Sequence, residues 1–238
     1  MPDKIPLADI LKELIKHPDE ILSVDLLSEL EEGYTLLAKV IKVVAECIET
    51  DAERIKIVEK LELTSDLLAA TQSPTKSNWP HLLAALKQLK GTVLIAFFKQ
   101  CPVFTNELLS IPGDDNITSL HIALSVLKGP ALKAFLENCE ELSSDSLALQ
   151  TKTGATALHI AIDFLSSEDL KLFLARCLPL SQKALMTEFG DKGSVLHLAA
   201  VRLSKEDFAV FKAKCALPLV FRGVLASTAV EPQLCPST

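Results

Sequence analysis

Hydrophobic positions recur along this chain at a fixed step. Six sets of four residues, each 38 positions apart, align without a gap. The sets are Leu82, Leu120, Leu158 and Leu196; Ala85, Ala123, Ala161 and Ala199; Leu89, Leu127, Leu165 and Leu203; Leu94, Leu132, Leu170 and Phe208; Phe97, Phe135, Phe173 and Phe211; and Cys101, Cys139, Cys177 and Cys215. A constant step of this size predicts one supersecondary unit stacked on copies of itself.

Within one unit, these positions fall on two helical faces. In the first regular unit, two groups of three show the i, i+3, i+7 spacing of a single face: Leu82, Ala85 and Leu89, and then Leu94, Phe97 and Cys101. A short break such as Lys128-Gly129-Pro130 separates the two groups. Glycine and proline end helices, so each unit is predicted to be a helix A, a tight turn and an antiparallel helix B.

The same pattern predicts ten helices and the class of the fold. We expect them near residues 36–49, 52–62, 80–90, 93–101, 118–127, 131–139, 157–165, 168–177, 195–203 and 206–215. A single hairpin leaves an apolar side uncovered, and stacking covers it. The expected fold is therefore all-α, an α-solenoid of stacked helix-turn-helix units.

After helix B, a hydroxyl residue precedes a short apolar stretch. Examples are Leu63-Thr64-Ser65-Asp66 and Leu142-Ser143-Ser144-Asp145, and Leu22-Ser23-Val24-Asp25 looks like an earlier copy. Serine and threonine are preferred at the N-cap of a helix. The simplest prediction is one further turn of helix in each unit.

We expect one repeat domain over residues 1–238. It divides into N-terminal capping helices at 1–32 with a lone helix at 5–16, a divergent unit at 33–78, four regular units at 79–215, and a C-terminal cap and tail at 216–238. Arg222 is the only charge in the apolar segment 216–230. We expect this segment to fold back over the last helix pair; docking on a second copy or on a partner is the alternative.

Three short segments carry a resemblance to ankyrin repeats. Thr118-Ser119-Leu120-His121-Ile122-Ala123 and Thr156-Ala157-Leu158-His159-Ile160-Ala161 resemble the T-P-L-H-x-A opening of that family, and Val195-Leu196-His197-Leu198-Ala199-Ala200 is a weaker match. The step departs from the family's period of about 33 residues, and the proline is replaced. The resemblance implies protein–protein recognition, typically by the turn tips and helix A.

Composition narrows the class of protein. The chain has 238 residues, 49% of them apolar, and a formal net charge of −7, with no basic stripe of the kind that phosphate backbones require. Met1-Pro2-Asp3-Lys4 leads into an amphipathic segment, and no run of 18 apolar residues occurs, so we expect neither signal peptide nor membrane span. Six cysteines in a chain this long favour free thiols in a reducing cytosol.

The histidines and cysteines that repeat along the chain could form three kinds of chemical site. His121, His159 and His197 could be a metal triad, but packed helices lie about 8–10 Å apart, whereas ligands of one zinc lie within about 4 Å of one another. We expect each imidazole instead to bond backbone in the neighbouring turn. The same spacing argues against a disulfide ladder. A Cys177–His159 nucleophile pair remains an alternative, although its recurrence in successive units favours a scaffold.

Positions that vary between units and face solvent are candidates for recognition. On helix A they form two columns, Lys87, Ser125, Asp163 and Val201, and Gln88, Val126, Phe164 and Arg202. Phe164 and Arg202 are our first choices, as large residues in adjacent units. The predicted turn tips add Asp114, Asp115, Lys152, Thr153, Asp191 and Lys192.

These observations leave three functions open. The first is a non-enzymatic adaptor or scaffold in the cytoplasm that binds a protein partner. The second is an ankyrin-like bacterial effector, which would be secreted into a host cell by a route that needs no signal peptide. An enzyme with the Cys–His site is the third. We expect no cofactor, metal or small-molecule substrate, and the identity of the partner is not encoded in any motif.

Overall fold

The computed structural model describes residues 7, 11, 16, 22, 30–31, 34–73 and 77–215. Fourteen α-helices dominate this part of the chain, so the predicted helical class is confirmed. Most of the lone helix expected at 5–16, most of the capping region 1–32 and the whole cap and tail at 216–238 lie outside the described residues.

Ten of the helices form five antiparallel pairs. The first members of the pairs, the A helices, are α3 (Leu36–Glu46), α6 (His81–Gln88), α9 (Ser119–Val126), α12 (Ala157–Phe164) and α15 (Val195–Arg202). The second members, the B helices, are α4 (Asp51–Val58), α7 (Gly91–Gln100), α10 (Gly129–Glu137), α13 (Ser167–Arg176) and α16 (Lys205–Lys214). From α6 onward, equivalent helices begin 38 residues apart.

A short helix follows each of the first four pairs. These are α5 (Ser65–Ala69), α8 (Asn106–Ser110), α11 (Ser144–Leu147) and α14 (Gln182–Met186). Each begins after a residue whose hydroxyl oxygen accepts a hydrogen bond from the backbone N–H three positions later. These residues are Thr64, Thr105, Ser143 and Ser181. The turn of helix predicted from the hydroxyl positions is therefore confirmed.

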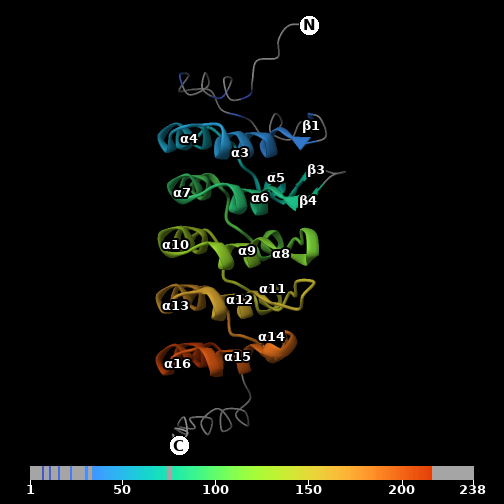
Figure 1. The fold of residues 1–238 in the computed structure, drawn as a ribbon, viewed down its shortest axis with the longest axis vertical. Helices are drawn as coiled ribbons and strands as arrows, with labels where there is room; N and C mark the ends of the chain where they lie inside the picture. The colour runs from blue at the N-terminus through green and yellow to red at the C-terminus, as the bar shows by residue number, and fades with distance from the viewer. Residues whose placement is uncertain are drawn as a thin grey trace, which may run out of the picture.

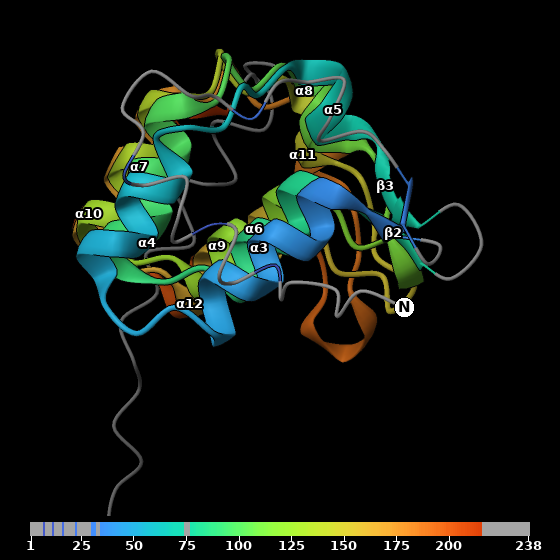
Figure 2. The ribbon, with the colours of Figure 1, turned by 90° about the horizontal axis from the view of Figure 1, so that it is seen from above.

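We call one A helix, its B helix and the short helix after it a layer. The layers lie one above the other along the long axis of the molecule (Figure 1). Each A helix contacts the next A helix, each B helix contacts the next B helix, and the short helices contact one another in the same way. Viewed along the stack, the A helices, the B helices and the short helices form three columns (Figure 2).

The first pair departs from the predicted bounds. Its helices were expected to reach 49 and 62, but α3 ends at Glu46 and α4 at Val58. The backbone of Leu22 explains the early end of α4, because its amide donates to Lys60 O and its carbonyl accepts from Glu62 N. Backbone committed to that bridge cannot continue a helix.

Similar backbone bridges join consecutive layers. Phe104 pairs in parallel with Cys139, Leu142 with Cys177, and Leu180 with Cys215. Each pairing brings the end of a B helix beside the segment that opens the previous layer's short helix. Long side chains reinforce the contact, since Arg176 and Lys214 donate to the carbonyl groups of Cys139 and Cys177.

The turns before the A helices contain the short β-strands of the described chain. β1 (Leu30–Glu31) pairs with β2 (Tyr34–Thr35), and β3 (Thr71–Ser73) pairs with β4 (Ser77–Pro80), both antiparallel. In later layers a single antiparallel bridge closes each turn, at Pro112–Thr118, Gln150–Thr156 and Glu188–Ser194. The 3-10 helices η1 (Asp114–Asn116) and η2 (Gly190–Lys192) form two of the tips.

The core follows the repeated hydrophobic positions. The four phenylalanines of the column, Phe97, Phe135, Phe173 and Phe211, are fully buried in their B helices. Phe135 also meets rings from the previous layer, with centroids 5.6 Å from Phe98 and 5.4 Å from Phe104. The aromatic contacts therefore connect layers as well as the helices within one layer.

Candidate protein-binding surface

The exposed apolar residues on the A helices lie near their C-terminal ends. Val126 ends α9 and is 46% exposed, Phe164 ends α12 and is 57% exposed, and Val201 near the end of α15 is 67% exposed. Ala123 and Leu120, three and six residues before Val126, are buried in the core. Val126 and Phe164 occupy equivalent positions in consecutive layers, and Arg202 occupies that position in the next layer, whereas Val201 is equivalent to Asp163.

Three of the sequence-predicted residues meet beside Phe164. The carboxylate of Asp163 lies 2.5 Å from Nζ of Lys192 and 3.7 Å from Nε of Arg202. The side chain of Asp163 is only 10% exposed, so it differs from the solvent-facing position that the sequence suggested. The carboxylate thus pairs with two cations and connects both α15 and the tip of η2 to α12, the helix that ends at Phe164.

Ion pairs also join successive turn tips. Nζ of Lys152 lies 3.2 Å from Asp115, and the Lys152 amide donates to the Asp115 carbonyl at 2.7 Å. Partial burial lowers the pKa of Lys87, and the nearby carboxylate of Asp114 counteracts part of that shift. The Lys152–Asp115 pair connects residues that the sequence had proposed only as separate surface positions.

The remaining candidate residues contribute less to the exposed surface or lie apart from Phe164. Ser125 is half-buried, and its hydroxyl donates to the Ile122 carbonyl within α9 at 2.9 Å. The side-chain oxygen of Gln88 is buried and has no hydrogen-bond partner among the described residues. Asp191 and Thr153 are exposed at their turn tips. The candidate surface is therefore centred on Phe164 and Arg202, with Val126 at one side.

A groove lies between two turn tips and reaches α12 at Ile160. It has a volume of about 420 Å³ and is lined by Asp115, Ile117, Thr151, Lys152 and Ile160, among others. Ile117 and Ile160 form an apolar floor, and the Asp115–Lys152 pair lies at the rim. An apolar floor with a polar rim is the arrangement found in protein interfaces.

The two inner histidines connect layers as predicted. Nε2 of His121 lies 3.1 Å from the Leu149 carbonyl, and Nε2 of His159 lies 3.4 Å from the Gly193 carbonyl. Nδ1 of His121 accepts from the Thr118 amide at 3.1 Å, which closes a capping box at the start of α9. With both ring nitrogens occupied by protein groups, the ring acts as a connector between layers.

His197, the third member of the column, is exposed. Its amide donates to the Ser194 hydroxyl at 3.2 Å, so the N-cap is kept at the start of α15. Among the described residues, no group of three or more His, Cys, Asp or Glu side chains could hold a metal ion.

The cysteines of the column are free and buried. Sγ of Cys177 donates to the Phe173 carbonyl at 3.3 Å, and burial raises the pKa of this thiol to about 12. Burial lowers the pKa of His159. A nucleophilic cysteine needs a lowered pKa, so the shift at Cys177 is opposite to what a Cys–His nucleophile requires.

One buried histidine, His81, lies outside the residues that repeat every 38 positions. His81, at the start of α6, donates from Nδ1 to the Leu67 carbonyl at 2.7 Å. Its Nε2 accepts from the hydroxyl of Thr35, the N-cap of α3, at 2.5 Å. His81 lies two residues before the position of the other histidines, at Leu83, so only the three-dimensional contact shows that it joins the first two layers.

Comparison with protein-family models and with curated proteins finds no match to this sequence. No helix of the described chain has the length and apolar character needed to cross a bilayer.

Proposed function

We propose that this protein is a non-enzymatic protein–protein interaction module, an adaptor or scaffold. Its described part would be a divergent, ankyrin-like α-solenoid that binds a partner along the ends of the A helices and the inter-layer turns. The observation that carries this proposal is the exposed ring of Phe164 beside the Asp163–Lys192–Arg202 cluster. Phenylalanine and arginine are both enriched in protein interfaces relative to the rest of the surface.

The rigidity of the surroundings supports the same function. Phe164 ends α12, whose first turn is fastened by the His159–Thr156 capping box. Asp163 connects α12 to η2 and to α15. A side chain presented by packed, connected helices loses little conformational entropy when a partner covers it. The buried, protonated thiols fit a reducing compartment, which is why we place the protein in the cytosol.

The proposal is tested by affinity capture with matched variants. Full-length protein and its Phe164→Ala and Arg202→Ala variants are used as bait, and captured proteins are identified by mass spectrometry. Losing a hot-spot residue weakens binding by at least about 2 kcal/mol, or about 30-fold. We expect a protein captured by the wild type to be lost with Phe164→Ala and reduced with Arg202→Ala.

Leu172→Ala is the matched control, because Leu172 is an exposed apolar residue on the B helix α13. It should capture the same partner as the wild type. If Leu172→Ala loses the partner while Phe164→Ala keeps it, the surface at the ends of the A helices is not the binding site.

A further inference from the structure

The first turns of consecutive B helices meet through carboxylates. Asp169, the third residue of α13, accepts from the Gly129 amide at the start of α10, at 3.1 and 3.3 Å to its two oxygens. One layer further, Asp207 of α16 accepts from the hydroxyl of Ser167, the first residue of α13, at 2.6 Å. At both contacts, an acidic group of one layer satisfies a donor at the positive end of the helix before it.

The contact between α4 and α7 has a carboxylate as well. There it comes from Asp51, the first residue of α4, which accepts from the Thr92 hydroxyl at 3.2 Å. The contact between α7 and α10 differs, because Ala131 stands where Asp169 and Asp207 stand in later layers. A methyl group cannot accept a hydrogen bond from the Gly91 amide at the start of α7.

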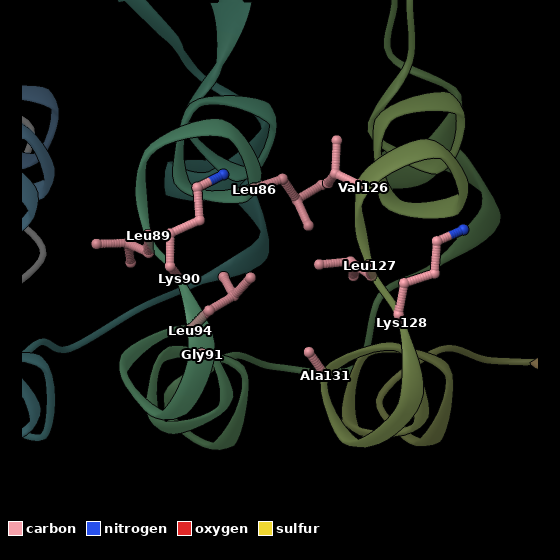
Figure 3. A pocket seen from close by; sticks show the side chains of 9 residues that line it. All are labelled: Leu86, Leu89, Lys90, Gly91, Leu94, Val126, Leu127, Lys128 and Ala131. Atoms are coloured by element: carbon pink, nitrogen blue, oxygen red, sulfur yellow. The ribbon is translucent and has the colours of Figure 1, made fainter. Parts of the chain in front are cut away.

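A pocket of about 280 Å³ occupies this position. Figure 3 shows Leu86 and Val126 pointing toward each other across it, with Leu94 below them and the Ala131 methyl group on the opposite side. The lining also includes Gly91 and two lysines, and none of its nine residues is acidic.

The two lysines differ in their contacts. Lys128 donates through Nζ to the Phe164 carbonyl of the next layer. Lys90 is the exposed residue that precedes α7, and no side-chain hydrogen bond caps that helix. The pocket thus combines an aliphatic wall, a lysine charge and the positive end of a helix.

We propose that this pocket binds an acidic side chain of a partner protein, with an adjacent aliphatic residue of the partner on Leu86 and Leu94. The partner's carboxylate would accept from the Gly91 amide, as Asp169 does from Gly129 one layer away. The proposal rests on the protein-binding function above and extends the same surface, because Val126 belongs to both. It names the chemistry of one part of the partner: an acidic residue beside an aliphatic one.

The test uses the full chain labelled with ¹⁵N and two short probes. Acetyl-Glu-Leu-amide and acetyl-Gln-Leu-amide have nearly the same shape and differ in charge. We expect the Glu peptide to shift the amide resonance of Gly91 and to bind about tenfold more tightly than the Gln peptide, the difference typical of a hydrogen bond to a charged group. Equal binding of the two peptides would overturn the proposal. So would equally tight binding of hexanoate, a carboxylate on an alkyl chain, because the site would then not require a peptide.

Ala131→Asp is the decisive variant, because it supplies the pocket with the carboxylate that the neighbouring layers have. Without any peptide it should shift the Gly91 amide, and it should weaken the Glu peptide at least tenfold. Lys90→Gln should weaken the Glu peptide, whereas Lys133→Gln, the same change at an exposed position of α10, should not. Unchanged binding in Ala131→Asp would overturn the site.

Failure here is distinguishable from failure of the proposed function. If Phe164→Ala loses a captured partner while the Glu peptide leaves Gly91 unmoved, protein binding stands and only the pocket assignment is wrong.

Discussion

The imidazole Nε2 of His121 lies 3.1 Å from the carbonyl oxygen of Leu149, in the turn of the following layer. Because the carbonyl can only accept, Nε2 must carry the proton, and Nδ1 is left to accept from the Thr118 amide. The neutral ring therefore satisfies both contacts, and a second proton on Nδ1 would face the Thr118 N–H.

This relationship predicts a loss of stability in mild acid. Burial lowers the pKa values of His81, His121 and His159 below the usual 6.5. The unfolded chain takes up these protons at higher pH than the folded chain, so the stabilisation is complete above about pH 6.5 and is lost as pH falls. In urea unfolding, the free energy of unfolding should be nearly constant from pH 8 to about pH 7 and should fall as the pH is lowered further to 5.5.

The double variant His121→Gln/His159→Gln is the comparison for this measurement. It should be less stable than the wild type at pH 8, with a shallower pH dependence. The same slope in both proteins would show that other groups cause the acid sensitivity.

Two substitutions of the capping residue Thr118 should distinguish the contribution of its hydroxyl group to stability from that of its methyl group. The hydroxyl lies 2.8 Å from Nδ1 of His121 and caps α9. Thr118→Ala should lower the free energy of unfolding by about 1–2 kcal/mol. Thr118→Ser should be close to neutral, because Ser194 caps α15 in the same way. Equal losses in chemical denaturation would indicate that the methyl packing is what matters.

Phe→Ala substitutions in the phenylalanine column should lower the free energy of unfolding by different amounts. Phe→Ala in a core costs about 3–5 kcal/mol. Phe135 contacts the rings of Phe98 and Phe104, whereas Phe211 stacks with Phe208 of its own helix, at 6.4 Å between centroids. Phe135→Ala should therefore destabilise more than Phe211→Ala in denaturant titrations. The reverse order would mean that contacts between layers contribute little at this column.

Native thiol reactivity should be confined to exposed cysteine. Burial raises the pKa of Cys177 to about 12 and that of Cys215 to about 11, and it also raises the pKa values of Cys101 and Cys139. Iodoacetamide at pH 8, followed by peptide mapping, should modify Cys47, which is exposed, well before these four. All six cysteines of the chain should react in denaturant without reductant. A cysteine of the column labelled as fast as Cys47 would contradict the burial argument.

Much of the fold was predictable because its signals are local. The spacing of Leu82, Ala85 and Leu89 placed one face of α6 toward the core, and the helices from α6 onward begin and end within about two residues of the predicted bounds. Histidine contacts with the neighbouring turn were also predictable, because spacing alone excluded a shared metal. The end of α4 was not, since it depends on the bridge between Leu22 and Leu61.

The sequence by itself determined the helices, their order and the residues that face the core, because each depends on the hydrophobic pattern within about ten residues. Only the tertiary structure decided which distant side chains meet. Asp163, Lys192 and Arg202 come from three elements, and their meeting depends on how one layer sits on the next. The pocket at Ala131 is likewise a property of stacking: the sequence shows alanine where later layers have aspartate, but only packing leaves that volume open.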